Sequence, residues 1–162
     1  MIPFVLRPLK DLNTMGIGGM GKVFFPKEIE AFVAALKETP DAFILGGGSN
    51  VVFPDEDFPR PIIGTQFLNQ FNVQENQMKA QCGVRLSKLF DFAAGVPATV
   101  GGAVRINFGA LKKDISQYLI STELFLASGK IETWTQAQCE YGYRTSKIKK
   151  EVLIGGLIGS QN

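Results

Sequence analysis

AGVPATVGGAVRINFGA, residues 94–110, and LGGGSNVV, residues 45–52, are the two most informative stretches of this chain. Both place glycine and other small residues where an apolar, strand-like run stops. Main chain without bulky side chains can bring its N–H groups close to a phosphate. The two stretches together therefore predict a site for a phosphate-bearing ligand, although each one alone has an ordinary structural interpretation.

The first of these loops, residues 46–50, lies between two short apolar runs. Its three consecutive glycines can turn their amides toward an anion, and Ser49 and Asn50 add further donors. The alternative is a tight strand-to-strand turn. The local sequence leaves both interpretations open.

The second loop combines a rigid start at Pro97, the hydroxyl of Thr99 and the amide of Asn107 with several glycines. Such a segment can pass under a flat ring or beside a phosphate without steric conflict. The alternative is an irregular glycine loop that covers a sheet. Here too the residues themselves do not decide.

Hydrophobic periodicity predicts an α+β chain with one lobe ending near Ile63 and a larger lobe after it. An apolar stripe at i, i+3, i+4 and i+7 predicts a helix over residues 27–38, ended by the Thr39-Pro40 step. A shorter helical stripe covers residues 86–93, and residues 94–110 are expected to be mostly loop. Strands are predicted at residues 22–25, 43–45, 51–53, 61–63, 67–73, 78–84, 119–126, 130–134 and 152–158.

A formal G-x-G-x-x-G occurs at Gly16, Gly18 and Gly21, with Asp41 at a suitable distance downstream. A dinucleotide-binding motif of this kind must follow a strand and open a helix. Here a strand-like run at residues 23–25 lies between the glycines and the helix. We therefore interpret the motif as a flexible glycine-rich turn.

Composition limits the kinds of ligand and reaction that this chain is expected to support. The 162 residues are 45% hydrophobic with a formal net charge of +2, which favours a folded core and gives no strong signature of nucleic-acid binding. No apolar run is long enough to cross a membrane, and a soluble cytoplasmic protein is the simplest interpretation. The chain has no histidine and two widely separated cysteines, Cys82 and Cys139, so no metal site is predicted. Reactive chemistry would then come from a cofactor.

Four motifs in order carry a resemblance to a known family: Asn13-Thr14 with GIGG, GGGSN, residues 94–110, and YGYRTSK at residues 141–147. In this order they resemble the UDP-N-acetylenolpyruvoylglucosamine reductases. The resemblance implies an α+β, two-lobed FAD-binding fold of the vanillyl-alcohol oxidase (PCMH) type, with FAD held between the lobes. It implies one FAD-binding subdomain at residues 1–64 and a second at 65–162, with the family's C-terminal substrate domain absent.

The same resemblance assigns the site. Tyr143 and Arg144 match the family's Tyr-Arg pair beside the substrate, and an arginine can clamp a carboxylate with two charge-assisted hydrogen bonds. The alternative for Arg144 is a surface arginine paired with a neighbour such as Glu140. The cofactor-binding residues would be Gly46, Gly47, Gly48, Ser49, Asn50, Val51, Gly83, Pro97, Ala98, Thr99, Val100, Gly101, Gly102, Ala103, Asn107 and Gly109.

The implied activity is FAD-dependent reduction of UDP-N-acetylglucosamine enolpyruvate by NADPH in peptidoglycan precursor synthesis. Two alternatives are a non-catalytic FAD-binding module and an FAD-linked oxidase of a small hydroxy acid. The family's third domain supplies a serine acid and a late glutamate, and Ser160 stands in no matching motif. Ala98 also replaces the family's usual glycine, and the connection at residues 92–95 is shorter. We expect a monomer, or a separate chain that supplies the third domain.

Overall fold

The computed structural model describes residues 1–159 of the chain, so Ser160 lies outside the described residues. The chain forms two compact units. The first unit is Met1–Leu68 and the second begins at Asn69, four residues after the boundary expected from the sequence.

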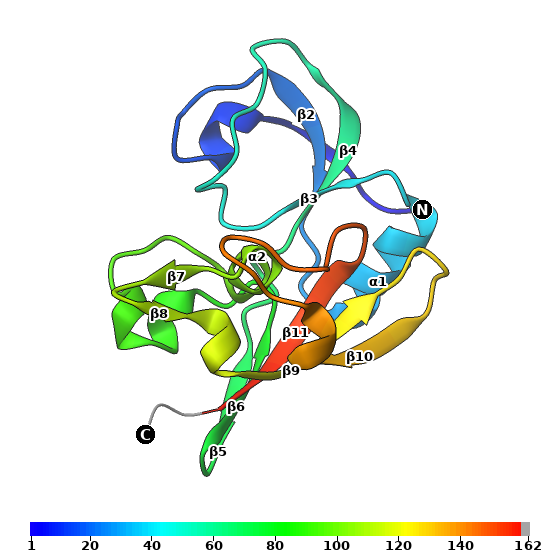
Figure 1. The fold of residues 1–162 in the computed structure, drawn as a ribbon. Helices are drawn as coiled ribbons and strands as arrows, with labels where there is room; N and C mark the ends of the chain where they lie inside the picture. The colour runs from blue at the N-terminus through cyan, green and yellow to red at the C-terminus, as the bar shows by residue number, and fades with distance from the viewer. Residues whose placement is uncertain (160–162) are drawn as a thin grey trace. The chain divides into compact units, whose positions relative to one another are not determined.

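The first unit contains a four-stranded sheet in the order β1-β2-β4-β3 (Figure 1). Strand β1 pairs antiparallel with β2, whereas β2 and β3 both pair parallel with β4. Because parallel neighbours end at the same edge, the segments that follow β3 and β4 leave the sheet together. The elements are β1 Val5–Pro8, the 3-10 helix η1 Leu9–Leu12, β2 Met20–Phe24, α1 Ile29–Glu38, β3 Phe43–Leu45 and β4 Phe58–Gly64.

The helix α1 confirms the predicted apolar stripe but begins two residues later than expected. Glu28 is still extended, with φ −124° and ψ 152°, and caps the helix without a side-chain hydrogen bond. Phe32, Ala35 and Leu36 are the buried residues of α1. The helix ends at Thr39, whose N–H and hydroxyl both donate to the carbonyl of Ala35 at 2.9 and 2.6 Å.

Aromatic side chains fill the core of the first unit. Phe53 lies edge-on to Phe43 and Phe58, with ring centroids 5.8 and 5.4 Å away. The predicted strand at residues 51–53 is wrong, because these residues pair with no strand. Val51 and Phe53 instead pack into the core formed by Leu9, Val23, Leu45 and Ile62.

The second unit is built on a five-stranded antiparallel sheet in the order β10-β9-β11-β6-β5 (Figure 1). The predicted hairpin around Ala127-Ser128-Gly129 is confirmed as β9 and β10. The strands are β5 Phe71–Gln74, β6 Gln77–Gln81, β7 Gly109–Ala110, β8 Lys113–Asp114, β9 Leu119–Phe125, β10 Ile131–Thr135 and β11 Val152–Gly159. The helices are η2 Leu86–Lys88, η3 Asp91–Ala93, α2 Val100–Ile106, η4 Ile115–Gln117 and η5 Ala137–Cys139.

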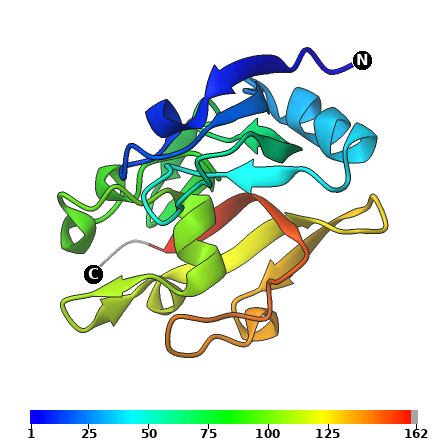
Figure 2. The ribbon, with the colours of Figure 1, turned by 90° about the horizontal axis from the view of Figure 1, so that it is seen from above.

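The expectation that residues 94–110 are mostly loop is wrong, because α2 occupies their centre. Thr99 caps the helix by accepting a hydrogen bond from the N–H of Gly102 at 3.4 Å, and Asn107 ends it in the left-handed region. Two glycines cost helix propensity of about 1 kcal/mol each. Burial of Val100, Ala103 and Val104 offsets that cost. The helix packs against β6 and β11, and Figure 2 shows it beside β11.

The second predicted helical stripe, residues 86–93, is two short 3-10 helices, η2 and η3. Phe90, with φ −141° and ψ 129°, is extended between them and breaks the helix. Its ring packs 5.1 Å from both Phe92 and Tyr118, centroid to centroid. Tertiary packing of these rings therefore overrides the helical periodicity.

Candidate functional site

The glycine-rich turn of residues 46–51 leaves the sheet of the first unit at the carboxyl end of β3. Leu45 carbonyl accepts the N–H of Thr65, the first residue after β4, at 2.9 Å. The carbonyl of Gly48 accepts the N–H of Thr14 at 3.1 Å. This bond places the Asn13-Thr14 motif directly beside the glycine turn.

The three glycines of this turn differ in what they do. Gly48 is buried in the left-handed region at φ +69°, and an added Cβ would collide with the carbonyl oxygen of Leu12. Gly47, Ser49 and Asn50 are exposed. Gly48 is therefore a packing requirement, whereas Gly47 presents bare main chain to an approaching group. Gly46 and Val51 are half-buried at the ends of the turn.

The formal G-x-G-x-x-G is not wholly the flexible turn that the sequence predicted, because its last glycine lies in a strand. Gly21 lies inside β2, and no helix follows it directly. An added Cβ on Gly18 would come within 2.8 Å of the Phe53 Cβ, and one on Gly19 within 2.6 Å of the Asp55 carbonyl oxygen. Close packing inside the unit explains Gly18 and Gly19 without a ligand, whereas Gly16 has a left-handed φ of +66° and open space at its Cβ position.

In the second unit, main-chain hydrogen bonds bring Gly83 next to the second glycine segment. Leu86 N–H donates to the carbonyl of Ala98 at 2.9 Å, and Val100 N–H donates to that of Val84 at 2.8 Å. Gly101 N–H donates to the carbonyl of Cys82 at 2.8 Å. Two sequence segments predicted separately to bind one cofactor thus run side by side.

The residues of this segment divide into a packed and an accessible set. A Cβ on Gly101 would lie 3.1 Å from both the Cβ and the carbonyl oxygen of Cys82, so the absence of a side chain allows α2 to approach. A Cβ on Gly102 would meet only the Thr99 hydroxyl oxygen, at 3.6 Å. Gly83, Thr99, Val100 and Ala103 are buried, Ala98 and Gly101 are half-buried, and Pro97 and Gly102 are exposed.

Tyr143 and Arg144 are the two central residues of a tight turn. Gly142 and Thr145 exchange main-chain hydrogen bonds of 3.0 and 3.3 Å across it. Tyr143 is 91% exposed, and Arg144 adopts the left-handed region at φ 55°.

The Arg144 guanidinium is held by the residues that follow α2. It donates to the carbonyl of Gly109 at 2.7 Å, and its Cζ lies 5.5 Å from the centroid of the Phe108 ring. Glu140 pairs instead with Lys147, with 2.6 Å between Nζ and Oε1, so the alternative of an Arg144–Glu140 pair is not observed. An exposed guanidinium fixed in this way can present its remaining N–H donors to a carboxylate.

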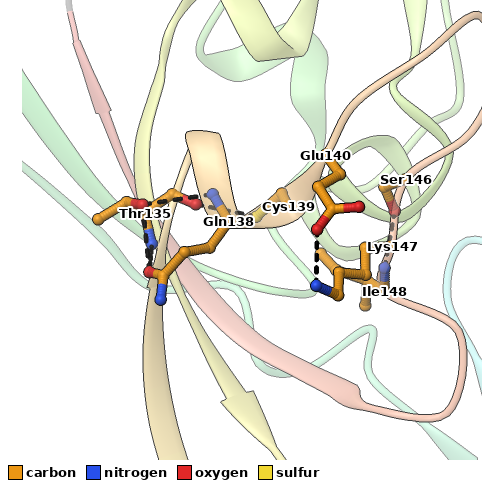
Figure 3. A network of polar contacts seen from close by, with 7 residues as sticks. All are labelled: Thr135, Gln138, Cys139, Glu140, Ser146, Lys147 and Ile148. Carbon is orange, nitrogen blue, oxygen red and sulfur yellow. Dashed lines mark hydrogen bonds and ion pairs between the residues drawn. The ribbon is translucent and has the colours of Figure 1, made fainter.

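Polar contacts connect residues on the two sides of this turn, residues 135–140 before it and 146–148 after it (Figure 3). Lys147 N–H donates to the carbonyl of Cys139 at 2.8 Å, and Ile148 N–H donates to the buried hydroxyl of Ser146 at 3.2 Å. Cys139 Sγ donates to the carbonyl of Thr135 at 3.3 Å. Burial raises the pKa of the Cys139 thiol above its ordinary value.

Several residues of this site have no signal in local sequence patterns. Phe108 lies between two residues assigned to the cofactor, and Arg105 bonds through its guanidinium to the carbonyls of Glu151, at 3.2 Å, and Lys149. Ser146 hydroxyl donates to the carbonyl of Arg105 at 2.6 Å. Arg105 and Phe108 lie within the motif of residues 94–110, and Ser146 lies within YGYRTSK, but neither motif predicts these contacts.

Metal and membrane signals are absent from the part of the chain that the structure describes. No cluster of three potential ligands from His, Cys, Asp and Glu occurs within residues 1–159. No helix in that range is long and apolar enough to cross a membrane.

Comparison of sequences finds relatives along nearly the whole chain, although no protein-family model matches it. A curated UDP-N-acetylenolpyruvoylglucosamine reductase of Caldicellulosiruptor saccharolyticus is 32% identical over 91% of this chain and 53% of its own length. The reductase of Petrotoga mobilis is 33% identical over 90% of this chain and 55% of its own length. The chain thus spans about half the length of the curated relatives it matches.

Solved structures give the same picture. The UDP-N-acetylenolpyruvylglucosamine reductase of Thermus caldophilus matches with a TM-score of 0.83 and 25% identity, over 99% of this chain and 64% of its own. Glucooligosaccharide oxidase of Acremonium strictum, described with a bound FAD, matches with a TM-score of 0.66 and 16% identity over 85% of this chain and 34% of its own. That second match concerns the fold alone. The predicted α+β fold of the vanillyl-alcohol oxidase type is confirmed. Over the half of their length that it spans, the chain is a homologue of the UDP-N-acetylenolpyruvoylglucosamine reductases.

Proposed function

We propose that this chain binds FAD as part of a UDP-N-acetylenolpyruvoylglucosamine reductase. The reaction is the cytoplasmic, NADPH-dependent reduction of UDP-N-acetylglucosamine enolpyruvate to UDP-N-acetylmuramate in peptidoglycan precursor synthesis. The observation that carries the proposal is the similarity to curated reductases over nine-tenths of the chain.

The residues present fit the FAD group in two places. Residues 46–51 form a turn in which Gly47, Ser49 and Asn50 are exposed, and Gly47 has no side chain to keep a diphosphate away from the main chain. In the second unit Gly83 lies beside the segment of residues 97–103, and Gly102 is exposed, with only the Thr99 hydroxyl oxygen, at 3.6 Å, near the position of an added Cβ. We assign the first group to the diphosphate and the second, with Gly109, to the rest of the cofactor. Residues 1–64 and 65–162 would act as the two FAD-binding subdomains.

FAD, when bound, supplies hydride transfer from NADPH to the enolpyruvyl double bond. This chain's own residues bind and orient. The Arg144 guanidinium would hold the carboxylate of the substrate and stabilise the negative charge that grows there during reduction. Its hydrogen bond to the Gly109 carbonyl and its contact with Phe108 fix its position before substrate arrives. Tyr143, the exposed residue beside it, would line the substrate side of the same turn.

The test begins with the visible spectrum of the purified chain before any cofactor is added. We expect the absorption bands of an oxidised flavin, or their appearance when FAD is supplied. A chain that takes up no FAD in either experiment would overturn the proposal.

NADPH oxidation, measured with and without the UDP-sugar, then separates the possible activities. Turnover that depends on the UDP-sugar supports the reductase, and a bound flavin without turnover supports an FAD-binding module. The likeness in fold to a glucooligosaccharide oxidase makes oxidation the competing chemistry. Reduction of the flavin by a small hydroxy acid would favour that third activity over the reductase.

A further inference from the structure

Asn107 uses both ends of its side chain inside the second unit. It ends α2 with φ 49° and ψ 59°, and only 8% of the residue is exposed. Its Nδ2 donates to the carbonyl of Gly142 at 3.0 Å, and its Oδ1 accepts the N–H of Ser116 at 3.2 Å. Its amide oxygen and its amide nitrogen are therefore both hydrogen-bonded to main-chain groups of this protein.

The bond from Asn107 to Gly142 holds the turn that contains Arg144. Gly142 is the first residue of that turn, and it exchanges two main-chain hydrogen bonds with Thr145, the last. Tyr143 and Arg144 lie between them. Asn107 therefore holds the turn at its base, on the carbonyl that precedes Tyr143.

The next two residues hold the turn at its tip. Phe108 lies under the Arg144 guanidinium, and the carbonyl of Gly109 accepts its N–H. Three consecutive residues after α2 thus contact the turn at successive points. Arg105 and Ser146 bind the following segment to the end of the same helix, through bonds that include the 2.6 Å contact of the Ser146 hydroxyl with the Arg105 carbonyl.

We infer that Asn107 is a positioning residue for Arg144 and not a cofactor contact. It links the end of α2 to the Tyr143–Arg144 turn, so that the guanidinium is fixed over Phe108. The inference rests on the proposed function only for the role of Arg144, which is to bind the carboxylate of the substrate. The geometric claim itself can be tested without FAD, NADPH or substrate.

Two substitutions separate the parts of the link. Asn107→Gly accepts the left-handed conformation at no steric cost and removes both side-chain hydrogen bonds. Asn107→Asp also tolerates that conformation and keeps an acceptor for Ser116 N–H, but it replaces the donor to Gly142 with an oxygen. Glu75→Gly is the matched control, because Glu75 is another left-handed residue, at φ 50°, in the β5–β6 hairpin of the same unit.

Trypsin provides the first readout, because cleavage after Arg144 requires its side chain to leave Phe108 and enter the protease. The reference is cleavage after the exposed Lys130, which precedes β10. In both Asn107 variants we expect the ratio of cleavage at Arg144 to cleavage at Lys130 to rise about tenfold, and no change in Glu75→Gly. A general loss of stability would raise both cleavages and leave the ratio unchanged, which would overturn the inference.

Nuclear magnetic resonance provides the second readout. The Arg144 side-chain protons of the unchanged chain should carry the ring-current shift of Phe108, and both Asn107 variants should lose it. The Asn107 amide protons should also show a nuclear Overhauser effect to the Gly142 Hα in the unchanged chain. Absence of that effect would refute the inference even if both variants failed to fold. Failure of FAD binding would leave all three measurements unaffected.

Discussion

Arg144 and Phe108 form a fixed pair, with the guanidinium Cζ 5.5 Å from the ring centroid. Cations over aromatic rings gain about 0.5–1 kcal/mol at exposed sites. Here the contact also orients a planar, exposed group that donates a hydrogen bond to the carbonyl of Gly109 at 2.7 Å. The pair holds a surface arginine in the position from which we propose that it binds a carboxylate.

Arg144→Lys should leave FAD bound and weaken the response to substrate. Lysine keeps the charge but loses the planar fork, so one charge-assisted hydrogen bond should be lost, which corresponds to about tenfold weaker binding. Titration of the UDP-sugar, followed by the flavin spectrum, measures this affinity. Lys149→Arg is a control at another exposed cation, five residues along the chain, and it should behave like the unchanged chain. An unaltered affinity in Arg144→Lys would remove Arg144 from the substrate site.

Gly47→Val should abolish retention of FAD while the chain stays folded. Gly47 is exposed and its φ lies outside the left-handed region, so a side chain there does not require left-handed backbone. The added isopropyl group instead blocks the main chain that we assign to the diphosphate. Absorbance of the purified protein measures bound flavin, and circular dichroism reports the fold. A folded variant that stayed equally yellow would count against this assignment.

Gly48→Ala, in contrast to Gly47→Val, should destabilise the first unit. Gly48 has φ +69°, and its Cβ would collide with the Leu12 carbonyl oxygen. Left-handed backbone costs a non-glycine residue about 1–2 kcal/mol, and the collision adds to this. Urea unfolding should show a free energy of unfolding lower by at least about 2 kcal/mol. Gly16→Ala shares a positive φ but has open space around its Cβ, so it should cost less.

Lys112→Gly should stabilise the chain. Leu111 and Lys112 connect β7 to β8 with φ of 52° and 64°, the conformation in which hairpins favour glycine. Relief of this strain outweighs the entropy of glycine in the unfolded chain, with a net gain of about 0.5–1 kcal/mol. Thermal unfolding measures the change. Lys113→Gly, within β8, should be destabilising, and an equal effect of the two changes would contradict the explanation.

Tyr141→Phe should be neutral or stabilising and should reduce the loss of stability at high pH. The Tyr141 hydroxyl is buried with no geometric hydrogen-bond partner in the described part of the chain. Burial, and to a lesser degree the neighbouring Cys139 thiol, raises the pKa of Tyr141. Its ordinary value is 10.0. The pKa of Tyr141 is higher in the folded chain than in the unfolded chain. Its contribution to the free energy of unfolding is therefore complete below pH 10.0 and declines as the pH rises above 10.0.

Urea unfolding at neutral pH and above the ordinary tyrosine pKa measures this change. Removal of an unpartnered hydroxyl should gain up to about 1 kcal/mol at neutral pH. Tyr143→Phe is the control, because Tyr143 is 91% exposed and should alter neither value. If the free energy of unfolding fell as steeply at high pH in Tyr141→Phe as in the unchanged chain, another group would be its cause.

Much of the local structure could be predicted from residue patterns. The apolar stripe of α1, the strand at Phe43–Leu45 and the β9–β10 hairpin depend on neighbouring residues, and they occur where expected. The segment of α2 could not be predicted, because its two glycines weaken the helix signal. Only burial of its apolar side against β6 and β11 makes the helix stable.

By itself the sequence determined the α+β class, the small-residue segments, and the order of motifs that points to the reductases, since these depend on residue type and spacing along the chain. The tertiary structure alone decided which segments meet. Gly83 lies beside residues 98–101, and Asn107 bonds to Gly142 at a separation of 35 residues. Such contacts arise from strand pairing and helix packing, which bring together main-chain groups that no local pattern relates.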